Sequence, residues 1–258
     1  MQISVQHLTH TFPSKPPRQA LADLSFEVAA GQFAAIVGPS GCGKSTLLRL
    51  AAGLLKPTDG QLLLDGSPPS QAARGRRIAW MAQSPALLPW LTAHANAALA
   101  LRFHRRDRPP RLSPEEALRL VGLSDAGGAH PFTLSGGMQQ RLALARTLTL
   151  DADLWLMDEP FSSLDELTRE QLSTELLSLW QPLRPTVLWV THNIYEALRL
   201  ADRVLVLSPR PAHLLADLPV LLPRPRREND PAFQSLLAGL RRALGLEIPA
   251  AAQEKVGP

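Results

Sequence analysis

The sequence has few of the residues that would place it in several classes of protein. It has one cysteine among 258 residues, which excludes an internal disulfide framework and suits a reducing compartment. No stretch of roughly 18 consecutive apolar residues occurs. Residues 1–12 mix polar and apolar residues instead of forming a charged-then-apolar signal segment. We therefore expect a soluble, cytoplasmic chain that reaches a membrane only through a partner.

Aromatic residues are also scarce, at 5% of the chain, which leaves few platforms for stacking bases although the formal net charge is +4. Arginine-rich clusters lie at 74–77, 102–111 and 224–227. Arginine greatly outnumbers lysine, and alanine, proline, glycine and leucine are abundant, so the charge reflects composition rather than a nucleic-acid surface. We expect no nucleic-acid partner and interpret these arginines as solvated surface or as contacts with an acidic membrane face.

Short, nearly continuous apolar runs are the main structural signal. Each is bounded by polar residues, as expected of strands that are covered on both faces of a largely parallel sheet. Each also runs into a polar group or a loop at its carboxyl end, where ligands bind in open α/β sheets. The polar residues after the runs should therefore converge on one site. The runs are 33–37, 78–82, 154–157 and 186–190.

Helical spacing alternates with these runs, which predicts an α/β fold. The N-terminal segments ISVQHLTHTF and LADLSFEV alternate apolar and polar residues and predict an antiparallel flank. No strong strand pattern occurs between about 85 and 150, so we expect an inserted helical subdomain there. We expect a single domain, with its core at about 1–84 and 151–207 and a tail at about 208–258. The helical patterns are 45–55, 114–123, 138–150, 167–180 and 233–244.

The segment GPSGCGKS (38–45) fits the P-loop pattern and lies between a predicted strand and a predicted helix, which is the context that the motif requires. Its glycines allow the backbone N–H groups to face phosphates, and the helix adds its positive end. Lys44 would reach the β- and γ-phosphates of ATP, while Ser45 would supply a hydroxyl to Mg²⁺. The alternative is a chance glycine turn. The residues assigned to nucleotide binding here are Gly38, Pro39, Ser40, Gly41, Cys42, Gly43, Lys44, Ser45 and Thr46.

Two carboxylates end the predicted strand in LWLMDEP (154–160). Asp158 would hold the Mg²⁺ shell, and Glu159 would act as the general base that polarises the attacking water. Adjacent acids at a strand end could instead cap the next helix. Their pairing with a P-loop favours the catalytic interpretation.

Two further residues follow predicted strands at the same edge of the sheet. His192, taken alone, is more often a turn or core residue, but at this edge it would contact the γ-phosphate and orient Glu159 and water. Gln83 could be an ordinary surface amide, or it could bind Mg²⁺ or water and report the nucleotide state to the helical subdomain. The sequence thus assigns catalysis to Lys44, Glu159 and His192, and metal binding to Ser45, Gln83 and Asp158.

The segment LSGG (134–137) predicts a phosphate site at a helix N-terminus. Ser135 is a suitable N-cap, and Gly136 and Gly137 allow close backbone approach. A plain helix cap without a ligand is the alternative. Because the chain already has a phosphate cradle at 38–45, we expect LSGG of one copy to close over the ATP of another in a two-fold homodimer.

Residues 1 to about 208 resemble the ATP-binding cassette (ABC) ATPases. The resemblance rests on GPSGCGKST, Gln83, LSGGMQQR, LWLMDEP, SSLD (162–165) and VTH (190–192). It implies a P-loop NTPase (RecA-like) core with a largely parallel sheet. It also implies that Phe12, where the family more often has Tyr, stacks on adenine, and that Ser163, Leu164 and Asp165 cross the dimer interface. Asn193 replaces the usual Asp after the switch histidine, and we expect activity to survive this change.

Two less specific stretches, 83–92 and 208–226, are similar to the ATPase subunits of importers for nitrate, sulfonates, taurine and related small solutes. This similarity implies a peripheral subunit at the cytoplasmic face of the inner membrane. Its partners would be a multi-span permease, contacted mainly through residues 84–105, and indirectly a solute-binding protein. A non-transport ABC ATPase that regulates an envelope complex, and the motor of an ABC exporter, remain as alternatives.

Overall fold

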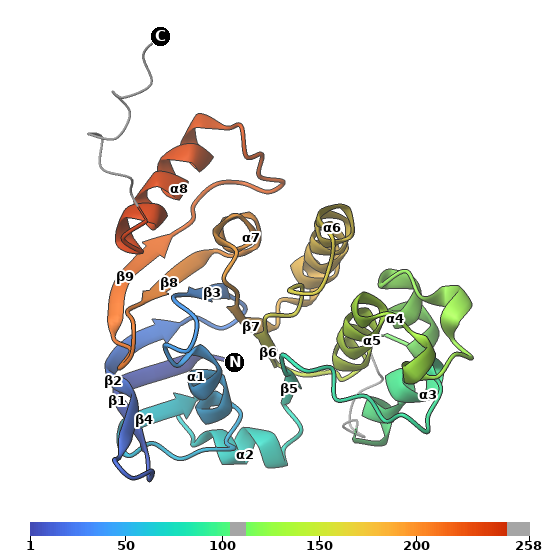
Figure 1. Ribbon diagram of the computed structural model, residues 1–258, viewed down its shortest axis with the longest axis horizontal. Coiled ribbons are helices and arrows are strands. Elements are labelled where there is room, and N and C mark those ends of the chain that lie inside the picture. The colour runs from blue at the N-terminus through green and yellow to red at the C-terminus, as the bar shows by residue number, and fades with distance from the viewer. Residues whose placement is uncertain (104–111, 247–258) are drawn as a thin grey trace.

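Two β-sheets and several groups of helices form the computed structural model, which describes residues 1–103 and 112–246 (Figure 1). The larger sheet has the strand order β5-β6-β7-β3-β8-β9. Its strands from β5 to β8 are parallel, and β9 is antiparallel to β8, which confirms a largely parallel sheet. The strands are β3 (Phe33–Val37), β5 (Ile78–Met81), β6 (Leu154–Asp158), β7 (Thr186–Val190), β8 (Arg203–Leu207) and β9 (Leu214–Pro219).

The central strands are apolar throughout because both of their faces are buried. Side chains of a strand alternate between faces, so Phe33, Ala35 and Val37 of β3 enter one core while Ala34 and Ile36 enter the other. The first core is shared with α6 (Glu166–Leu183), α7 (Ile194–Leu200) and α8 (Pro231–Ala243), and the second with α1 (Lys44–Ala51). Burial of each large apolar side chain stabilises this arrangement by roughly 2 kcal/mol.

A separate antiparallel sheet at the N-terminus covers the second core and confirms the predicted flank. Its order is β2-β1-β4, with β1 (Ile3–Phe12), β2 (Arg18–Val28) and β4 (Asp59–Leu64). The strand β4 and the short helix α2 (Pro69–Arg74) were not predicted. The first three residues of β4 are exposed, and its apolar residues form no alternating pattern, so the sequence carries only a weak strand signal there.

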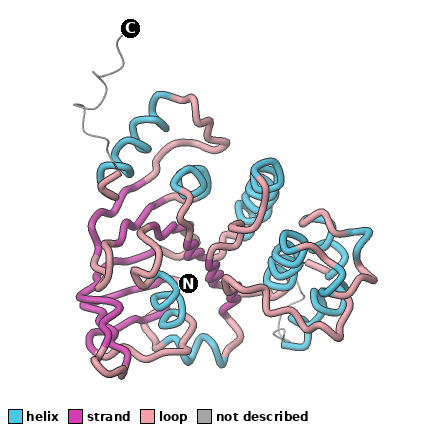
Figure 2. The backbone as a smooth tube through the Cα atoms, in the orientation of Figure 1, coloured by secondary structure: helices cyan, strands magenta, loops and turns pink. Residues whose placement is uncertain are grey.

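Helices joined by loops, without strands, form the described part of the inserted subdomain, residues 85–103 and 112–150, as Figure 2 shows by the absence of strand colouring there. Residues 104–111, which were expected to belong to it, lie outside the described residues. Three helices begin at side-chain caps, Thr92, Ser113 and Ser135, which accept hydrogen bonds from backbone N–H groups three residues further on. The helices are α3 (Ala93–Ala98), η1 (Leu99–Phe103), α4 (Pro114–Leu120), η2 (Ser124–Ala126), η3 (Pro131–Thr133) and α5 (Gly136–Leu148).

The C-terminal segment is more closely joined to the core than the sequence indicated. The expected boundary before residue 208 falls between β8 and β9, which pair in the same sheet, so it does not separate a tail from the core. The predicted amphipathic stretch forms α8, whose Phe233, Leu237 and Leu240 are buried at helical spacing. Residues 247–258 lie outside the described residues. None of the described helices has the length and apolar character needed to cross a membrane.

Candidate nucleotide-binding and hydrolysis site

The carboxyl ends of β3, β5, β6 and β7 lie side by side and bring the predicted residues together. Asp158, the last residue of β6, is in register with Val190, the last of β7, and Val190 is in register with Ile36 of β3. A cavity of about 540 Å³ opens at this edge. All of the side chains and backbone groups that line it belong to the set assigned from the sequence: Ser40, Gly41, Gly43, Lys44, Ser45, Thr46, Gln83, Glu159 and His192.

Lys44 is held at the base of this cavity by its own loop. Its side chain is buried, and its Nζ donates to the carbonyl oxygens of Gly38, at 2.7 Å, and Pro39, at 2.9 Å. An ammonium group has three donors, so one remains for an anion in the cavity. The thiol of Cys42 is buried in the second core, so this residue can offer only its backbone to a nucleotide.

Side chains that follow the neighbouring strands β5 and β7 contact the carboxylate of Glu159, which follows β6. Its Oε2 accepts a hydrogen bond from Nε2 of Gln83 at 3.3 Å and lies 3.4 Å from Nδ1 of His192. Its backbone N–H donates to the carbonyl of Val190 at 2.9 Å, and its φ of 50° lies in the left-handed region. A non-glycine residue rarely adopts this conformation, and such strain is typical of functional sites. The geometry therefore directs one carboxylate into the cavity beside Gln83 and His192.

Asp158 and Ser45 provide oxygen atoms suited to a magnesium ion. Burial raises the pKa of the Asp158 carboxyl above its ordinary value, against the opposing effect of a hydrogen bond from Ser45. Among the described residues, no group of three His, Cys, Asp or Glu side chains could hold a metal ion. A hydroxyl and one or two carboxylates that are completed by phosphate oxygens are the usual surroundings of Mg²⁺. The residues present thus fit Mg²⁺ bound together with a nucleotide.

Asn193, the predicted departure from the family, caps α7. Its Oδ1 accepts hydrogen bonds from the backbone N–H groups of Tyr195, at 3.0 Å, and Glu196, at 3.1 Å. Its own N–H donates to Oγ1 of Thr191 at 3.0 Å. An aspartate would make the same cap, so the substitution preserves the backbone geometry that places His192 at the cavity.

LSGG does not reach the cavity of its own chain. Ser135 accepts a hydrogen bond from the N–H of Met138 at 3.2 Å and so caps α5, as predicted. Ser135 and Gly136 are exposed and do not line the cavity. A Cβ atom built on Gly136 would meet no described residue within 4 Å, so nothing in that part of the chain requires glycine at this position.

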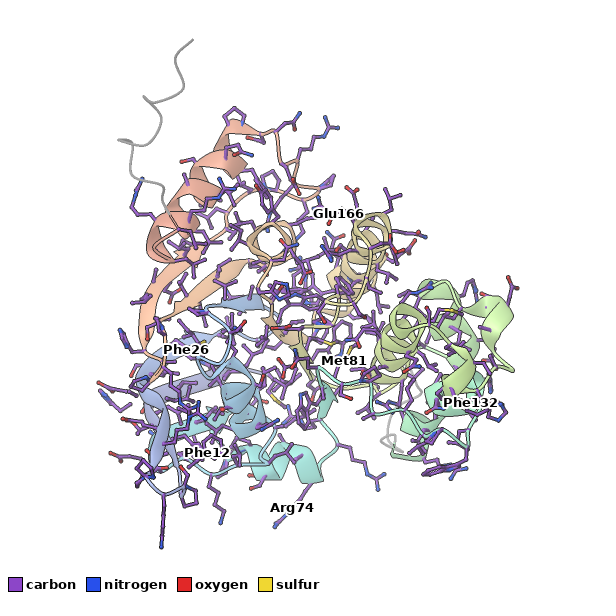
Figure 3. All side chains as sticks on the ribbon, in the orientation of Figure 1. Phe12, Phe26, Arg74, Met81, Phe132 and Glu166 are labelled. Atoms are coloured by element: carbon purple, nitrogen blue, oxygen red, sulfur yellow. The ribbon has the colours of Figure 1, made fainter. Side chains whose placement is uncertain are left out.

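Two further predicted residues also lie away from the cavity lining. Phe12 is at the end of β1, labelled in Figure 3, where it is partly buried and packs edge-on against His10 with ring centroids 4.7 Å apart. Asp165 caps α6 by accepting a hydrogen bond from the N–H of Thr168 at 2.9 Å, and this bond lowers the pKa of its carboxyl. The proposed roles of both residues remain predictions.

Two arginines that the sequence analysis missed hold the functional loops. Arg146 of α5 donates to the carbonyls of Pro85, at 2.7 Å, and Ala86, at 2.8 Å, and so ties the loop after Gln83 to the helix that begins at LSGG. Arg169 of α6 donates to the carbonyl of Leu164 at 2.8 Å, within SSLD. Arg146 binds backbone carbonyls, which no sequence pattern reveals. Arg169 also forms an ion pair with Glu166 at 2.8 Å and i,i+3 spacing, but that pairing indicates α6 and not the contact with Leu164.

A P-loop at the carboxyl edge of a parallel sheet, joined by a strand-end acid pair, a glutamine and a histidine, defines the class of P-loop ATPases. The family model described as ABC transporter matches residues 21–162, slightly more than half of the chain. The chain therefore belongs to the ABC transporter family and is one of its ATP-binding, ATP-hydrolysing subunits.

Curated relatives of the chain include several import ATP-binding proteins. The nitrate import ATP-binding protein of Synechococcus elongatus is 42% identical over 88% of this chain and 85% of its own length. The taurine import ATP-binding protein of Rhizobium johnstonii is 44% identical over 83% and 82%. The aliphatic sulfonates import ATP-binding protein of Pseudomonas fluorescens is 42% identical over 99% and 91%.

Solved structures of cassettes share the fold. The dimeric post-hydrolysis state of the ATP-binding cassette MJ0796 bound to ADP and Pi superposes with a TM-score of 0.76, at 29% identity, over 84% of this chain and 98% of that one. A bacterial Atm1-family ABC exporter with ATP bound has a TM-score of 0.74, at 26% identity, over 92% of this chain and 42% of that one. The cassette fold is thus shared with an ABC exporter, so the fold alone does not distinguish import from export.

The raised pKa of Asp158 leads to a prediction on stability. Asp158→Asn should raise the free energy of unfolding of the nucleotide-free chain at pH 7 by roughly 1 kcal/mol or more, because the amide avoids the burial of a charge. The folded chain binds the Asp158 proton more tightly than the unfolded chain does. Wild-type stability therefore gains on acidification, and the difference between the two proteins should shrink as the pH falls.

Urea unfolding between about pH 5 and pH 8 measures this difference. Asp125→Asn, at an exposed position of the helical subdomain, is the matched control and should leave stability nearly unchanged. An Asp158→Asn protein that is less stable than wild type at every pH would show that the buried carboxylate is net stabilising, contrary to this account.

Proposed function

We propose that the chain is the ATP-hydrolysing motor subunit of a bacterial ABC importer and that Glu159 is its general base. The observation that carries the mechanism is the convergence of Gln83 and His192 on Oε2 of Glu159, at 3.3 and 3.4 Å, in the cavity lined by the P-loop. Proton transfer requires a base within hydrogen-bond reach of the attacking water. Glu159 is the carboxylate that lines the cavity beside the P-loop, which supports this role.

Each residue of the site has a distinct part in this mechanism. The P-loop backbone and Lys44 hold the phosphates, and the remaining donor of the Lys44 ammonium stabilises charge that develops on the γ-phosphoryl group. Glu159 accepts a proton from the attacking water, while His192 fixes the carboxylate and donates toward the γ-phosphate. Bound through Ser45, Asp158 and Gln83, Mg²⁺ would neutralise phosphate charge.

The functional unit in this proposal is a two-fold homodimer. The open space around Gly136 and the exposure of Ser135 leave a helix N-terminus free to hold the γ-phosphate of a nucleotide on a second copy. The related cassette MJ0796 is dimeric in its post-hydrolysis state bound to ADP and Pi, which supports this arrangement. Phe12 would stack on adenine, and Ser163, Leu164 and Asp165 would lie between the two copies.

The cargo we infer is nitrate, a sulfonate, taurine or a related small solute, because the relatives at 42–44% identity carry these names. The chain would act at the cytoplasmic face of the inner membrane, attached to a multi-span permease that receives the solute from a binding protein. Closure of the dimer would drive the permease only if the permease has a conformation matched to the closed dimer.

Glu159→Gln should bind ATP as the unmutated chain does but lose roughly 10²-fold or more in turnover, because an amide cannot accept the proton of the attacking water. The matched control is Glu175→Gln, a change of the same chemistry on α6 outside the cavity, which should keep normal turnover. Steady-state phosphate release and equilibrium nucleotide binding give the two quantities. Turnover by Glu159→Gln at the unmutated rate would exclude Glu159 as the base.

Gly136→Ala tests whether a second copy of the chain approaches closely at LSGG. No described residue lies near the added methyl group, so stability should stay within about 1 kcal/mol of the unmutated value. Steady-state ATP hydrolysis should fall by about tenfold or more, the effect of losing one hydrogen bond to a charged phosphate across an interface. Gly128→Ala, also at an open position of the helical subdomain, should leave ATPase activity and stability unchanged.

Light scattering in the Glu159→Gln background then shows whether the lost activity comes from a lost dimer contact or from a defect within one chain. Mg·ATP should produce a dimer with Gly128→Ala but much less of it with Gly136→Ala. Full ATPase activity and normal dimer formation with Gly136→Ala would rule out the close approach of a second copy at this glycine.

The assignment to import is tested through the membrane partner. Glu159→Gln protein that is trapped with Mg·ATP in source-cell membranes should co-purify with a multi-span permease and with a solute-binding protein, both identified by mass spectrometry. A single-span envelope protein in their place would indicate a regulator, and a permease that exports would indicate an exporter motor. Either result would leave the ATPase mechanism intact and overturn the importer assignment.

A further inference from the structure

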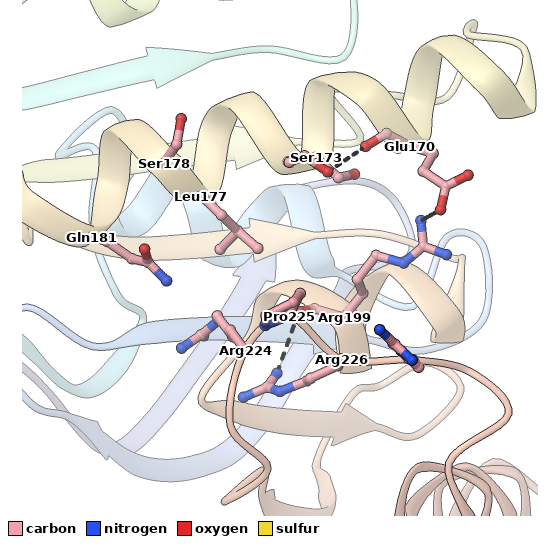
Figure 4. A pocket seen from close by; sticks show the side chains of 11 residues that line it. Glu170, Ser173, Leu177, Ser178, Gln181, Arg199, Arg224, Pro225 and Arg226 are labelled. Carbon is pink, nitrogen blue, oxygen red and sulfur yellow. Dashed lines mark hydrogen bonds and ion pairs between the residues drawn. The ribbon is translucent and has the colours of Figure 1, made fainter.

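A second cavity, of about 500 Å³, lies between α6 and the arginine-rich segment 224–227 (Figure 4). One wall is the α6 face that carries Ser173, Leu177 and Gln181, and the other is formed by the arginines and by Arg199 at the end of α7. No residue is shared with the lining of the nucleotide cavity. Its volume falls in the range of small-molecule sites.

The lining of this cavity has more positive than negative charge. It includes Arg199, Arg224, Arg226 and Arg227, but among the described residues Glu170 is the only carboxylate in it. Arg199 is largely neutralised, since it lies 3.6 Å from Glu170 and donates to Glu228, outside the lining, at 2.7 Å. Arg224 also has a carboxylate partner outside the lining, Asp202 at 2.7 Å, so the uncompensated charge comes from Arg226 and Arg227.

Arg226 contributes a positive charge without a carboxylate partner in the described part of the chain. It is buried, and its guanidinium donates to backbone carbonyls at the end of α7, including those of Leu198, at 2.6 Å, and Ala201, at 2.5 Å. Burial lowers its pKa to about 10, and the neighbouring Arg224 acts in the same direction. The group is still charged at neutral pH, so it makes the cavity electropositive while it fixes the segment to α7.

Arg224 has an unsatisfied donor. One of its terminal nitrogens lies 2.7 Å from Asp202, and the other donates to the carbonyl of Leu200 at 2.5 Å. The guanidinium also lies over the ring of Trp180, 4.9 Å from the centroid. Its Nε is buried and has no hydrogen-bond partner within residues 1–103 and 112–246. Such an orphaned donor in a native protein calls for an acceptor. Because Nε is closed to solvent, an anion in the adjoining cavity supplies one when the Arg224 side chain turns toward it.

The rest of the lining completes an anion site with an apolar side. Arg227 is exposed, and its side chain has no hydrogen bond or ion pair with any residue that the structure describes. The hydroxyls of Ser173, Thr174 and Ser178 donate to carbonyls of α6, so Gln181 is the neutral donor left on that wall. Leu177 offers an apolar contact beside it.

We propose that this cavity binds a small oxyanion, such as sulfate, phosphate or an organic sulfonate or carboxylate, through Arg227, Nε of Arg224 and Gln181. A planar guanidinium matches two oxygens of such an anion, and hydrogen bonds between charged partners are the stronger ones. The bound anion bridges α6 and the segment that holds the end of α7. Asp165, the last residue of SSLD, caps the start of α6, and Asn193, next to His192, caps the start of α7. The anion site thus joins these two helices toward their opposite ends.

The test is a sulfate titration of the full chain, followed by NMR of the arginine Nε–Hε groups, with sodium chloride keeping the ionic strength constant. Lys44→Ala is present throughout, because the P-loop itself would bind sulfate. The expected result is a saturable shift of the Arg224 signal. Arg224 and Arg226 are not mutated, since both support the backbone at the end of α7 and their loss could unfold the segment.

Arg227→Gln should raise the dissociation constant for sulfate about tenfold, the effect of one lost charge-assisted hydrogen bond. Arg119→Gln, on an exposed position of α4, removes the same charge far from the cavity and should leave the constant unchanged. The proposal is overturned if the Arg224 signal does not move with sulfate, or if both variants bind sulfate with the same constant.

Discussion

The burial of the central sheet on both faces constrains everything else in the molecule. Strands β3, β6 and β7 lie between two apolar cores, and their backbone groups are satisfied by the strand ladder. An ionised side chain inside these strands would lose its hydration without compensation. Polar chemistry is therefore confined to the strand ends, and parallel strands end at the same edge. Asp158 marks the limit, since it is the last residue of β6 and its pKa is already raised by burial.

At that edge a single carboxylate joins three segments that are distant in the sequence. Glu159 follows β6, Gln83 follows β5 and His192 follows β7, and all three meet at Oε2 of Glu159. Arg146 extends this connection, because it holds the loop after Gln83 against α5, which begins at LSGG. The Glu159 carboxylate is thus linked through Gln83 and the loop after it to the helical subdomain. Because Arg146 binds backbone carbonyls, it fixes this loop regardless of the side chains in the loop.

The sequence predicted many of the elements whose signal is local, although β8 (Arg203–Leu207) was missed despite a continuous buried apolar run. Continuous apolar runs identified β3, β5, β6 and β7, and the residues after them identified every group that lines the nucleotide cavity. The strand β9 escaped because its residues LLADLP are half exposed, lie at a sheet edge and end in proline, which gives no buried-strand pattern. Arg146 and Arg169 escaped for a different reason. In the loops they bind backbone carbonyls, and no residue type there indicates that an arginine will do so; the ion pair of Arg169 with Glu166 lies within α6 and gives no sign of the contact with SSLD.

Phe12, LSGG and Asp165 remain predictions because one chain does not contain what they would contact. Within its described residues, each chain has a phosphate cradle and an exposed helix N-terminus, at Ser135, that does not reach it. If the N-terminus of one copy closes the cradle of another, a two-fold arrangement satisfies both cradles at once and leaves neither N-terminus unused. A head-to-tail contact without closure would leave one of each free at the ends and would build a filament. In the proposed dimer, the two-fold symmetry thus follows because the P-loop cradle and the LSGG helix N-terminus of one chain do not reach each other.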